Sequence, residues 1–165
     1  MVSLRLLTSS DVPSCRNLEK DVTLQHQINN RSNIMNKAEL VKSTEGYSVA
    51  TVGNLDSFEG KAFVKDILGT TSVELSFGTL APGTSVPFFH HHKQNEEVYV
   101  VLSGEGVFIL DGKEEPVASG SIVRVAPEVS RNTKCTGDVP LVYICIQGKV
   151  GSLEQYTMTD GVVEQ

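Results

Sequence analysis

The sequence predicts an all-β fold, a jelly-roll barrel of roughly eight or more strands. Apolar and polar residues alternate over short segments, as they do between Val73 and Thr79, where every second side chain shares a face. Glycine, proline and aspartate mark turns at intervals of about 8–12 residues, a spacing typical of sandwiches and barrels. After residue 46, no apolar stripe with a helical period competes with this pattern.

The expected strands follow one another with short connections. Pro82-Gly83 marks a turn, and Asp111-Gly112 is the strongest hairpin signal in the chain. In chain order, the predicted strands cover residues 61–68, 72–80, 84–92, 97–102, 107–110, 116–118, 120–125 and 139–147, with residues 153–158 as a candidate edge strand.

The composition describes an ordinary single-domain protein. The 165 residues carry a formal net charge of −6 and no cluster of Lys or Arg, which argues against a nucleic-acid partner. The three cysteines are odd in number and widely spaced, which favours a reducing compartment over a disulfide framework. No apolar run approaches the ~20 residues of a membrane-spanning helix. We therefore expect a cytoplasmic location, with neither nucleic acid nor membrane as a partner.

The first 34 residues differ in composition from the rest. They are rich in Ser, Asn, Gln and Thr and show no sustained periodicity, while Met35 opens a segment that would be a reasonable protein start. We expect residues 1–34 to form an N-terminal extension that is either disordered or not native. Residues 35–165 are expected to form the barrel domain.

A histidine cluster is the most informative feature of the chain. His90, His91 and His92 are adjacent, and Glu96 and Glu97 follow after a short polar run. On an extended segment His90 and His92 point to one face and His91 to the other, and a glutamate on the next strand can return to face the pair. Two imidazoles and a carboxylate form a metal-ligand set. The residues therefore predict a metal site, with His91 outside it.

The stretch from Pro82 to Gly104 resembles the first motif of the cupin superfamily, which consists of a glycine, His-x-His, a glutamate and a second glycine. Four residues separate Glu97 from His92, and six separate it from Gly104. This spacing assigns the carboxylate ligand to Glu97, and Glu96 is expected on the solvated surface. The motif departs from the family pattern by one extra residue before its first histidine.

The second cupin motif is present only in a degraded form. Counted without gaps from Gly120, Arg131 falls where the motif has the histidine that is usually the fourth metal ligand, and Cys135 falls where it has an asparagine. The resemblance covers roughly residues 60–150. It implies a small single-domain cupin with a cupin-type jelly-roll, or double-stranded β-helix, barrel.

By this resemblance, His90, His92 and Glu97 would hold a divalent ion, Fe, Mn, Ni or Zn, and two alternatives for Arg131 stay open. In one, Arg131 stands beside the ion and binds the carboxylate or phosphate of a small anionic substrate. In the other, Arg131 pairs with Glu97, repels a cation and leaves the pocket free of metal. Tyr99 shares the face of Glu97 and is the second candidate for substrate binding, or else a core aromatic residue with its hydroxyl satisfied nearby.

Three functions suit these residues. The first is a metal-dependent enzyme, an oxygenase or isomerase acting on a small anionic metabolite, although the sequence leaves open whether any reaction takes place and assigns no catalytic residue. The second is a metal-free, non-catalytic small-molecule binding or sensor protein, which the loss of the fourth ligand favours. The third is a metal-free isomerase with His90 or His92 as base and Tyr99 as acid. Exposed sheet edges predict a homodimer.

Overall fold

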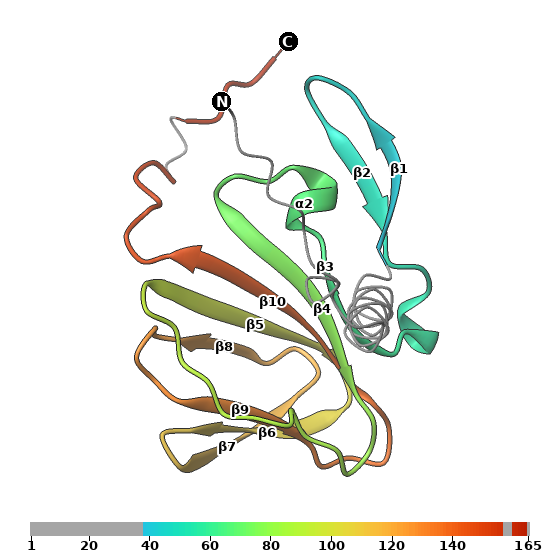
Figure 1. Cartoon of the computed structure of the whole chain (residues 1–165), viewed down its shortest axis with the longest axis vertical. Coiled ribbons are helices and arrows are strands. Elements are labelled where there is room, and N and C mark those ends of the chain that lie inside the picture. The colour runs from blue at the N-terminus through green and yellow to red at the C-terminus, as the bar shows by residue number, and fades with distance from the viewer. Residues whose placement is uncertain (1–37, 157–159, 165) are drawn as a thin grey trace, which may run out of the picture. The chain divides into compact units, whose positions relative to one another are not determined.

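β-Strands dominate the part of the chain that the computed structural model describes, residues 38–156 and 160–164 (Figure 1). In chain order the strands are β1 Glu39–Ser43, β2 Ser48–Thr51, β3 Gly60–Phe63, β4 Val73–Leu80, β5 Asn95–Ser103, β6 Glu105–Leu110, β7 Lys113–Ala118, β8 Ile122–Val125, β9 Arg131–Cys135 and β10 Leu141–Lys149. Two short helical turns, η1 Leu55–Ser57 and α2 Lys65–Leu68, lie between them. The predicted all-β jelly-roll fold is confirmed.

The strands form two larger sheets and one hairpin. The first sheet has the order β3-β4-β10-β5-β8, and the second has the order β7-β6-β9. All neighbouring strands in both sheets are antiparallel. Among the described residues, strands β1 and β2 pair only with each other. One buried apolar cluster takes side chains from both larger sheets, so these sheets pack face to face.

The apolar core fills the space between the two larger sheets. The Tyr99 ring on β5 packs at 4.7 Å from the ring of Phe108 on β6 and at 5.8 Å from that of Tyr143 on β10. The buried members of the cluster are Tyr99, Val101, Phe108, Val117, Val125, Cys135, Leu141, Tyr143 and Cys145. This core supports the candidate site, because two of its members, Tyr99 and Cys145, donate hydrogen bonds to Glu97.

Two turns depend on glycine. Asp111 and Gly112 both have positive φ, 48° and 79°, and they connect β6 to β7 as the predicted hairpin. Gly104, with φ 80°, connects β5 to β6, and a Cβ at this position would collide with the carbonyl of Pro140. The chain therefore passes so close to the start of β10 that only glycine fits.

The structure corrects two predicted strands. The strand predicted at residues 61–68 ends at Phe63 because the following residues turn into α2, whose first amide, Lys65 N, donates to Glu74 Oε1 at 3.1 Å. The strand predicted at residues 84–92 is an extended segment that contains only two isolated bridges. The predicted alternation is present at the histidines, where His90 and His92 are part-buried and His91 is exposed, although a continuous ladder does not form.

Other differences concern strands that the pattern did not reveal. The β1–β2 hairpin was not predicted, and β9 was not recognised as a strand of its own, because both segments are rich in polar residues. Residues 153–156 of the candidate edge strand contain no strand. Its last two residues, 157–158, lie outside the described residues. Strands β4, β5, β6, β7, β8 and β10 agree with prediction to within a few residues.

Among the helices that the structure describes, none is both long and apolar enough to span a membrane. The predicted N-terminal extension, residues 1–34, lies outside the described residues, and its boundary stays a prediction. The cytoplasmic location and the homodimer likewise stay predictions.

Candidate metal site

The two candidate histidines lie on the extended segment that links β4 to β5. Its backbone is fixed to β9 and to the turn before β9. His90 and Arg131 exchange two backbone hydrogen bonds, of 3.2 and 2.9 Å, and His92 N donates to the Pro127 carbonyl at 2.8 Å. The Asn132 amide adds two hydrogen bonds of 2.8 Å to carbonyls of the same segment, those of Val86 and Phe88. The segment is therefore held in place without being a strand.

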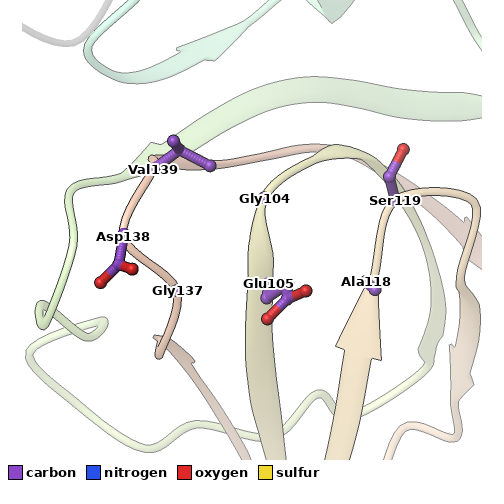
Figure 2. A pocket seen from close by; sticks show the side chains of 7 residues that line it. All are labelled: Gly104, Glu105, Ala118, Ser119, Gly137, Asp138 and Val139. Atoms are coloured by element: carbon purple, nitrogen blue, oxygen red, sulfur yellow. The ribbon is translucent and has the colours of Figure 1, made fainter.

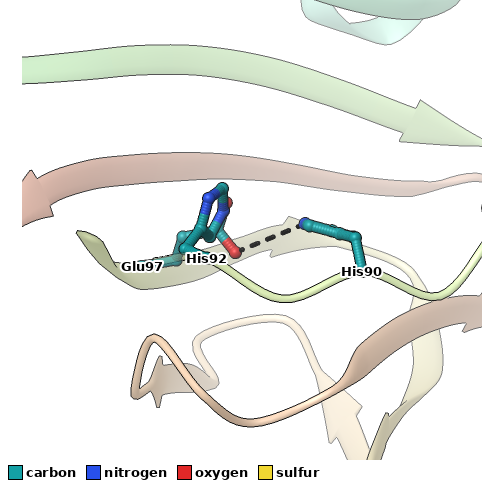
Figure 3. A group of neighbouring side chains, drawn as sticks. All are labelled: His90, His92 and Glu97. Carbon is teal, nitrogen blue, oxygen red and sulfur yellow. Dashed lines mark ion pairs between the residues drawn. The ribbon is translucent and has the colours of Figure 1, made fainter. Parts of the chain in front are cut away.

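The structure brings both histidines to Glu97 near the start of β5 (Figure 3). His92 Nε2 lies 3.2 Å from Glu97 Oε1, and His90 Nε2 lies 3.8 Å from Glu97 Oε2. The candidate ligand atoms of the three residues all lie within 4.8 Å of one another. Ligands about 2.1 Å from one ion are themselves roughly 3–3.5 Å apart, so this group is positioned to hold a metal ion.

The histidines differ in their surroundings. Burial lowers the pKa of His90 below its ordinary value; Glu97 opposes this shift, and Arg131 adds to it. The imidazole therefore favours the neutral form, which is the form that binds metals. His92 instead contacts the amide of Gln147, whose Nε2 lies 3.0 Å from each of its ring nitrogens.

Glu97 is the centre of the group and is only 4% exposed. Its Oε2 accepts a hydrogen bond of 2.7 Å from the Tyr99 hydroxyl, and its Oε1 accepts one of 3.4 Å from the Cys145 thiol. Burial by itself raises the pKa of Glu97, but the Tyr99 hydrogen bond, His92 and Arg131 together hold it below its ordinary value. The residue is therefore a carboxylate, the form that a cation requires.

Arg131 is completely buried and lies against the same carboxylate. Its Nε is 3.2 Å from Glu97 Oε2, within ion-pair distance, although this N–H is not aligned for a hydrogen bond. Its Nη atoms donate to three backbone carbonyls, those of Ala126, Pro127 and His90, at 3.1, 3.2 and 3.5 Å. The predicted pairing with Glu97 is present. The predicted contact with a substrate stays a prediction, and these contacts do not favour it because the protein already holds the guanidinium.

Tyr99, the other predicted substrate-binding residue, is 4% exposed, and its hydroxyl is bound to Glu97. Burial, followed by the nearby Cys145 and Glu97, raises its pKa. Burial, followed by Glu97, raises the pKa of the Cys145 thiol to about 12. Both groups keep their protons and donate hydrogen bonds to Glu97. The role of Tyr99 in substrate binding stays a prediction.

Sequence reasoning missed two neighbours of the group. The sequence alone assigns neither Cys145 nor Gln147 to the site, yet both side chains reach it from β10. Strand register explains why: Gln147 lies opposite Glu97, and Cys145 lies opposite Tyr99. The signal was present in the alternation of residues 143–147, but the register between β5 and β10 was needed to use it.

The two residues predicted to lie outside the site do so. His91 is exposed. Glu96 pairs with Arg124 on β8, with its Oε2 2.6 Å from the arginine Nε.

A separate pocket lies beyond the other end of β5, beside the turn into β6 (Figure 2). It has a volume of about 420 Å³ and is lined by Gly104, Glu105, Ala118, Ser119, Gly137, Asp138 and Val139. Two acidic residues and one serine line it, but no histidine or cysteine does. Its lining therefore lacks the mixed donor set of the histidine cluster, and the cluster is the stronger candidate.

The chain resembles several known proteins. A cupin protein of Bacteroides fragilis, whose crystal structure is known, is 40% identical, with a TM-score of 0.68, over 74% of this chain and 100% of that one. An oxalate-binding protein of Thermotoga maritima is 34% identical over 67 residues, 41% of this chain and 54% of that protein. An uncharacterised protein of Methanocaldococcus jannaschii is 30% identical over 66 residues, 40% of this chain and 53% of that protein. The chain thus spans about half the length of these two curated relatives.

Residues 76–147, which include His90, His92, Glu97 and Arg131, match the sequence family described as Cupin domain. The Bacteroides protein is matched over its full length, and its barrel superimposes on this one. The chain therefore belongs to the cupin superfamily.

Proposed function

We propose that this cupin binds a divalent metal ion through His90, His92 and Glu97 and holds a small anionic metabolite at that ion. The observation that carries the proposal is the convergence of two imidazoles and one carboxylate within 4.8 Å. The likeness to a Thermotoga protein named for oxalate binding supports an anion as the ligand.

A divalent ion with three protein ligands keeps open coordination positions, and it supplies Lewis-acid polarisation or oxygen activation when bound. The chain's own residues prepare the site for it. Tyr99 and Cys145 donate to the two oxygens of Glu97 and so fix the orientation of the carboxylate. Whether a reaction follows, of the oxygenase or isomerase kind, stays a prediction.

The charge of Arg131 is a second reason to expect an anion. A guanidinium stands where most cupins have a neutral imidazole, so a metal ion here would meet one more positive charge. At an effective dielectric near 20, a divalent and a monovalent cation about 6 Å apart repel each other by about 5 kcal/mol. Glu97 offsets part of this repulsion, and an anionic ligand at the metal would offset more.

A metal-free binding or sensor protein is the second candidate. The observation that favours it is the contact between Arg131 Nε and Glu97 Oε2 at 3.2 Å, because this cation already neutralises the carboxylate ligand. In this case the pocket would bind its anion without catalysis, and the histidines would be hydrogen-bond donors.

Elemental analysis of the purified, untagged protein tests the two candidates. The variants are His92→Ala, with the exposed neighbour His91→Ala as its matched control, and Arg131→His. We expect near-stoichiometric metal in the parent and in His91→Ala, and loss of most of it in His92→Ala. Arg131→His should bind metal more tightly, by about tenfold or more, because it removes a repulsive charge and adds a ligand.

Two results would decide against the proposal. A parent without metal, together with metal in Arg131→His, would show that the arginine has displaced the ion, and the metal-free candidate would replace the proposal. Equal metal content in His92→Ala and the parent would mean that the ion binds elsewhere.

A further inference from the structure

Lys61 is a cation on the inner face of the five-stranded sheet. On β4, Gly78 lies opposite Lys61 of β3 on one side and opposite Tyr143 of β10 on the other. A Cβ at Gly78 would meet the Tyr143 ring, which lies in the core between the sheets. Cross-strand partners share a face, so Lys61 faces the barrel interior. Its neighbour Ala62 faces away, into a different buried cluster.

The Lys61 side chain is directed towards the candidate site. Its ammonium lies 4.9 Å from the centroid of the Phe63 ring, two residues further along β3. Phe63 is opposite Ser76, and Ser76 is opposite Cys145. The ammonium therefore lies beside Phe63, in the same row of cross-strand partners as Cys145, whose thiol donates to Glu97.

The charges of the site agree with this placement. Burial is the largest reason that the pKa of His90 lies below its ordinary value, and Lys61 is among the cations that lower it further. Lys61 also opposes the rise of the Cys145 pKa, which burial dominates. Near the ligands, Glu97 is negative and Arg131 and Lys61 are positive, while Glu74, opposite Gln147 on β4, adds a second negative charge to the same face.

A bound divalent ion would leave the site with an excess of positive charge, which an anionic ligand would balance. Glu97 and Arg131 are buried and already paired with protein groups. Lys61 is only half-buried, and its contact in the structure is an aromatic face rather than a carboxylate. It is therefore the cation that is free to bind a ligand.

We propose that Lys61 binds the second anionic group of a small dicarboxylate whose first carboxylate lies at the metal. The inference rests on the proposed function, and it names both the class of ligand and the residue that selects it. A ligand with one carboxylate would use only the metal, so Lys61 would contribute specificity for the second charge.

Ligand titrations of the Co²⁺-loaded protein test this inference. Succinate and butyrate have the same number of carbons but two and one carboxylates, and binding is followed by calorimetry and by the visible spectrum of the bound Co²⁺. The proteins are the parent, Lys61→Met and the control Lys65→Met, which removes the same charge from α2, where Lys65 pairs with Asp66 at 3.4 Å. Methionine keeps an unbranched apolar stem against the Phe63 ring.

We expect the Kd for succinate to rise about tenfold in Lys61→Met, as for one lost charged hydrogen bond, while the Kd for butyrate changes less than about threefold. Lys65→Met should leave both values unchanged. Equal losses for succinate and butyrate, or no loss for either, would overturn the inference while leaving the proposed function in place. A parent that binds no Co²⁺ would contradict the proposed function, and the inference with it. A change in melting temperature without a change in the succinate-to-butyrate ratio would show a structural role only.

Discussion

The two motif regions of the barrel, residues 82–104 and 120–135, keep the same scaffold but bring different chemistry to the site. The first delivers the three candidate ligands, His90, His92 and Glu97, to one place. The second delivers Arg131 where cupins usually have a fourth ligand. Yet the Arg131 backbone still pairs with His90 through two hydrogen bonds. The second region has therefore kept its structural role while its side-chain chemistry has changed.

The difference shows that backbone placement and ligand chemistry are separable in this fold. In the first region polar side chains converge on Glu97 from the barrel interior. In the second, the Arg131 guanidinium turns towards backbone carbonyls and touches Glu97 only with Nε. Glu97 thus contacts side chains from both regions, and its substitution should have the largest effect on the free energy of unfolding.

Glu97→Gln should have the largest effect, because it removes the counter-charge of a fully buried arginine. An uncompensated buried charge costs about 3–5 kcal/mol, so the free energy of unfolding measured by urea denaturation should fall by about that amount. Combining it with Arg131→Met completes a double-mutant cycle. We expect the double variant to lose about 2–3 kcal/mol less than the sum of the single losses.

Additive losses in that cycle would mean that Glu97 and Arg131 contribute no interaction energy to stability, and that the two regions are not coupled through Glu97. Tyr99→Phe is the matched control on β5. It removes one hydrogen bond to Glu97 and should cost about 1–2 kcal/mol while leaving the arginine paired.

The two regions also differ in how much the sequence could predict. In the first, the spacing of His90, His92 and Glu97 predicted the group that the structure brings together, because the ligands are close in sequence. In the second, the degraded motif placed Arg131 at the right position, but its contacts with backbone carbonyls follow from how the turn before β9 folds. The positions of Cys145 and Lys61 relative to the candidate ligands depend on strand register, which alternation alone does not fix. The polar strand β9 lacked the apolar alternation that identifies strands.

Asn132→Ala tests whether the second region positions the first. The Asn132 amide donates to the carbonyls of Val86 and Phe88, so its loss leaves two acceptors of the histidine segment without their partner. We expect the free energy of unfolding to fall by about 2–3 kcal/mol and metal affinity to weaken by about tenfold. Lys134→Ala, an exposed change on the same strand, is the control and should alter neither value. Unchanged metal affinity in Asn132→Ala would mean that the histidine segment holds its geometry without the Asn132 amide.

The pH dependence of stability tests the surroundings of Glu97, the ligand of the first region that accepts a hydrogen bond from the Cys145 thiol of β10. Burial raises the pKa of this thiol from 9.0 to about 12 in the folded protein. The unfolded chain therefore releases the proton first, and the stability that the neutral thiol provides below pH 9.0 is lost progressively as the pH rises towards 12. Between pH 8 and pH 10 this thiol alone should reduce the free energy of unfolding by about 1 kcal/mol.

Cys145→Ala lacks that titration, so its free energy of unfolding should fall less steeply than that of the parent over the same pH range. The variant is also expected to be less stable at every pH, because it loses a buried side chain, and only the difference in slope reports on the thiol. Tyr143, whose pKa burial raises to about 12, is present in both proteins, so the burial part of its shift cancels and only the smaller part due to Cys145 differs. Parallel curves would mean that the thiol ionises as easily in the folded state as in the unfolded one. Glu97 would then be more hydrated than its 4% exposure indicates. The loss of stability expected for Glu97→Gln would be correspondingly smaller.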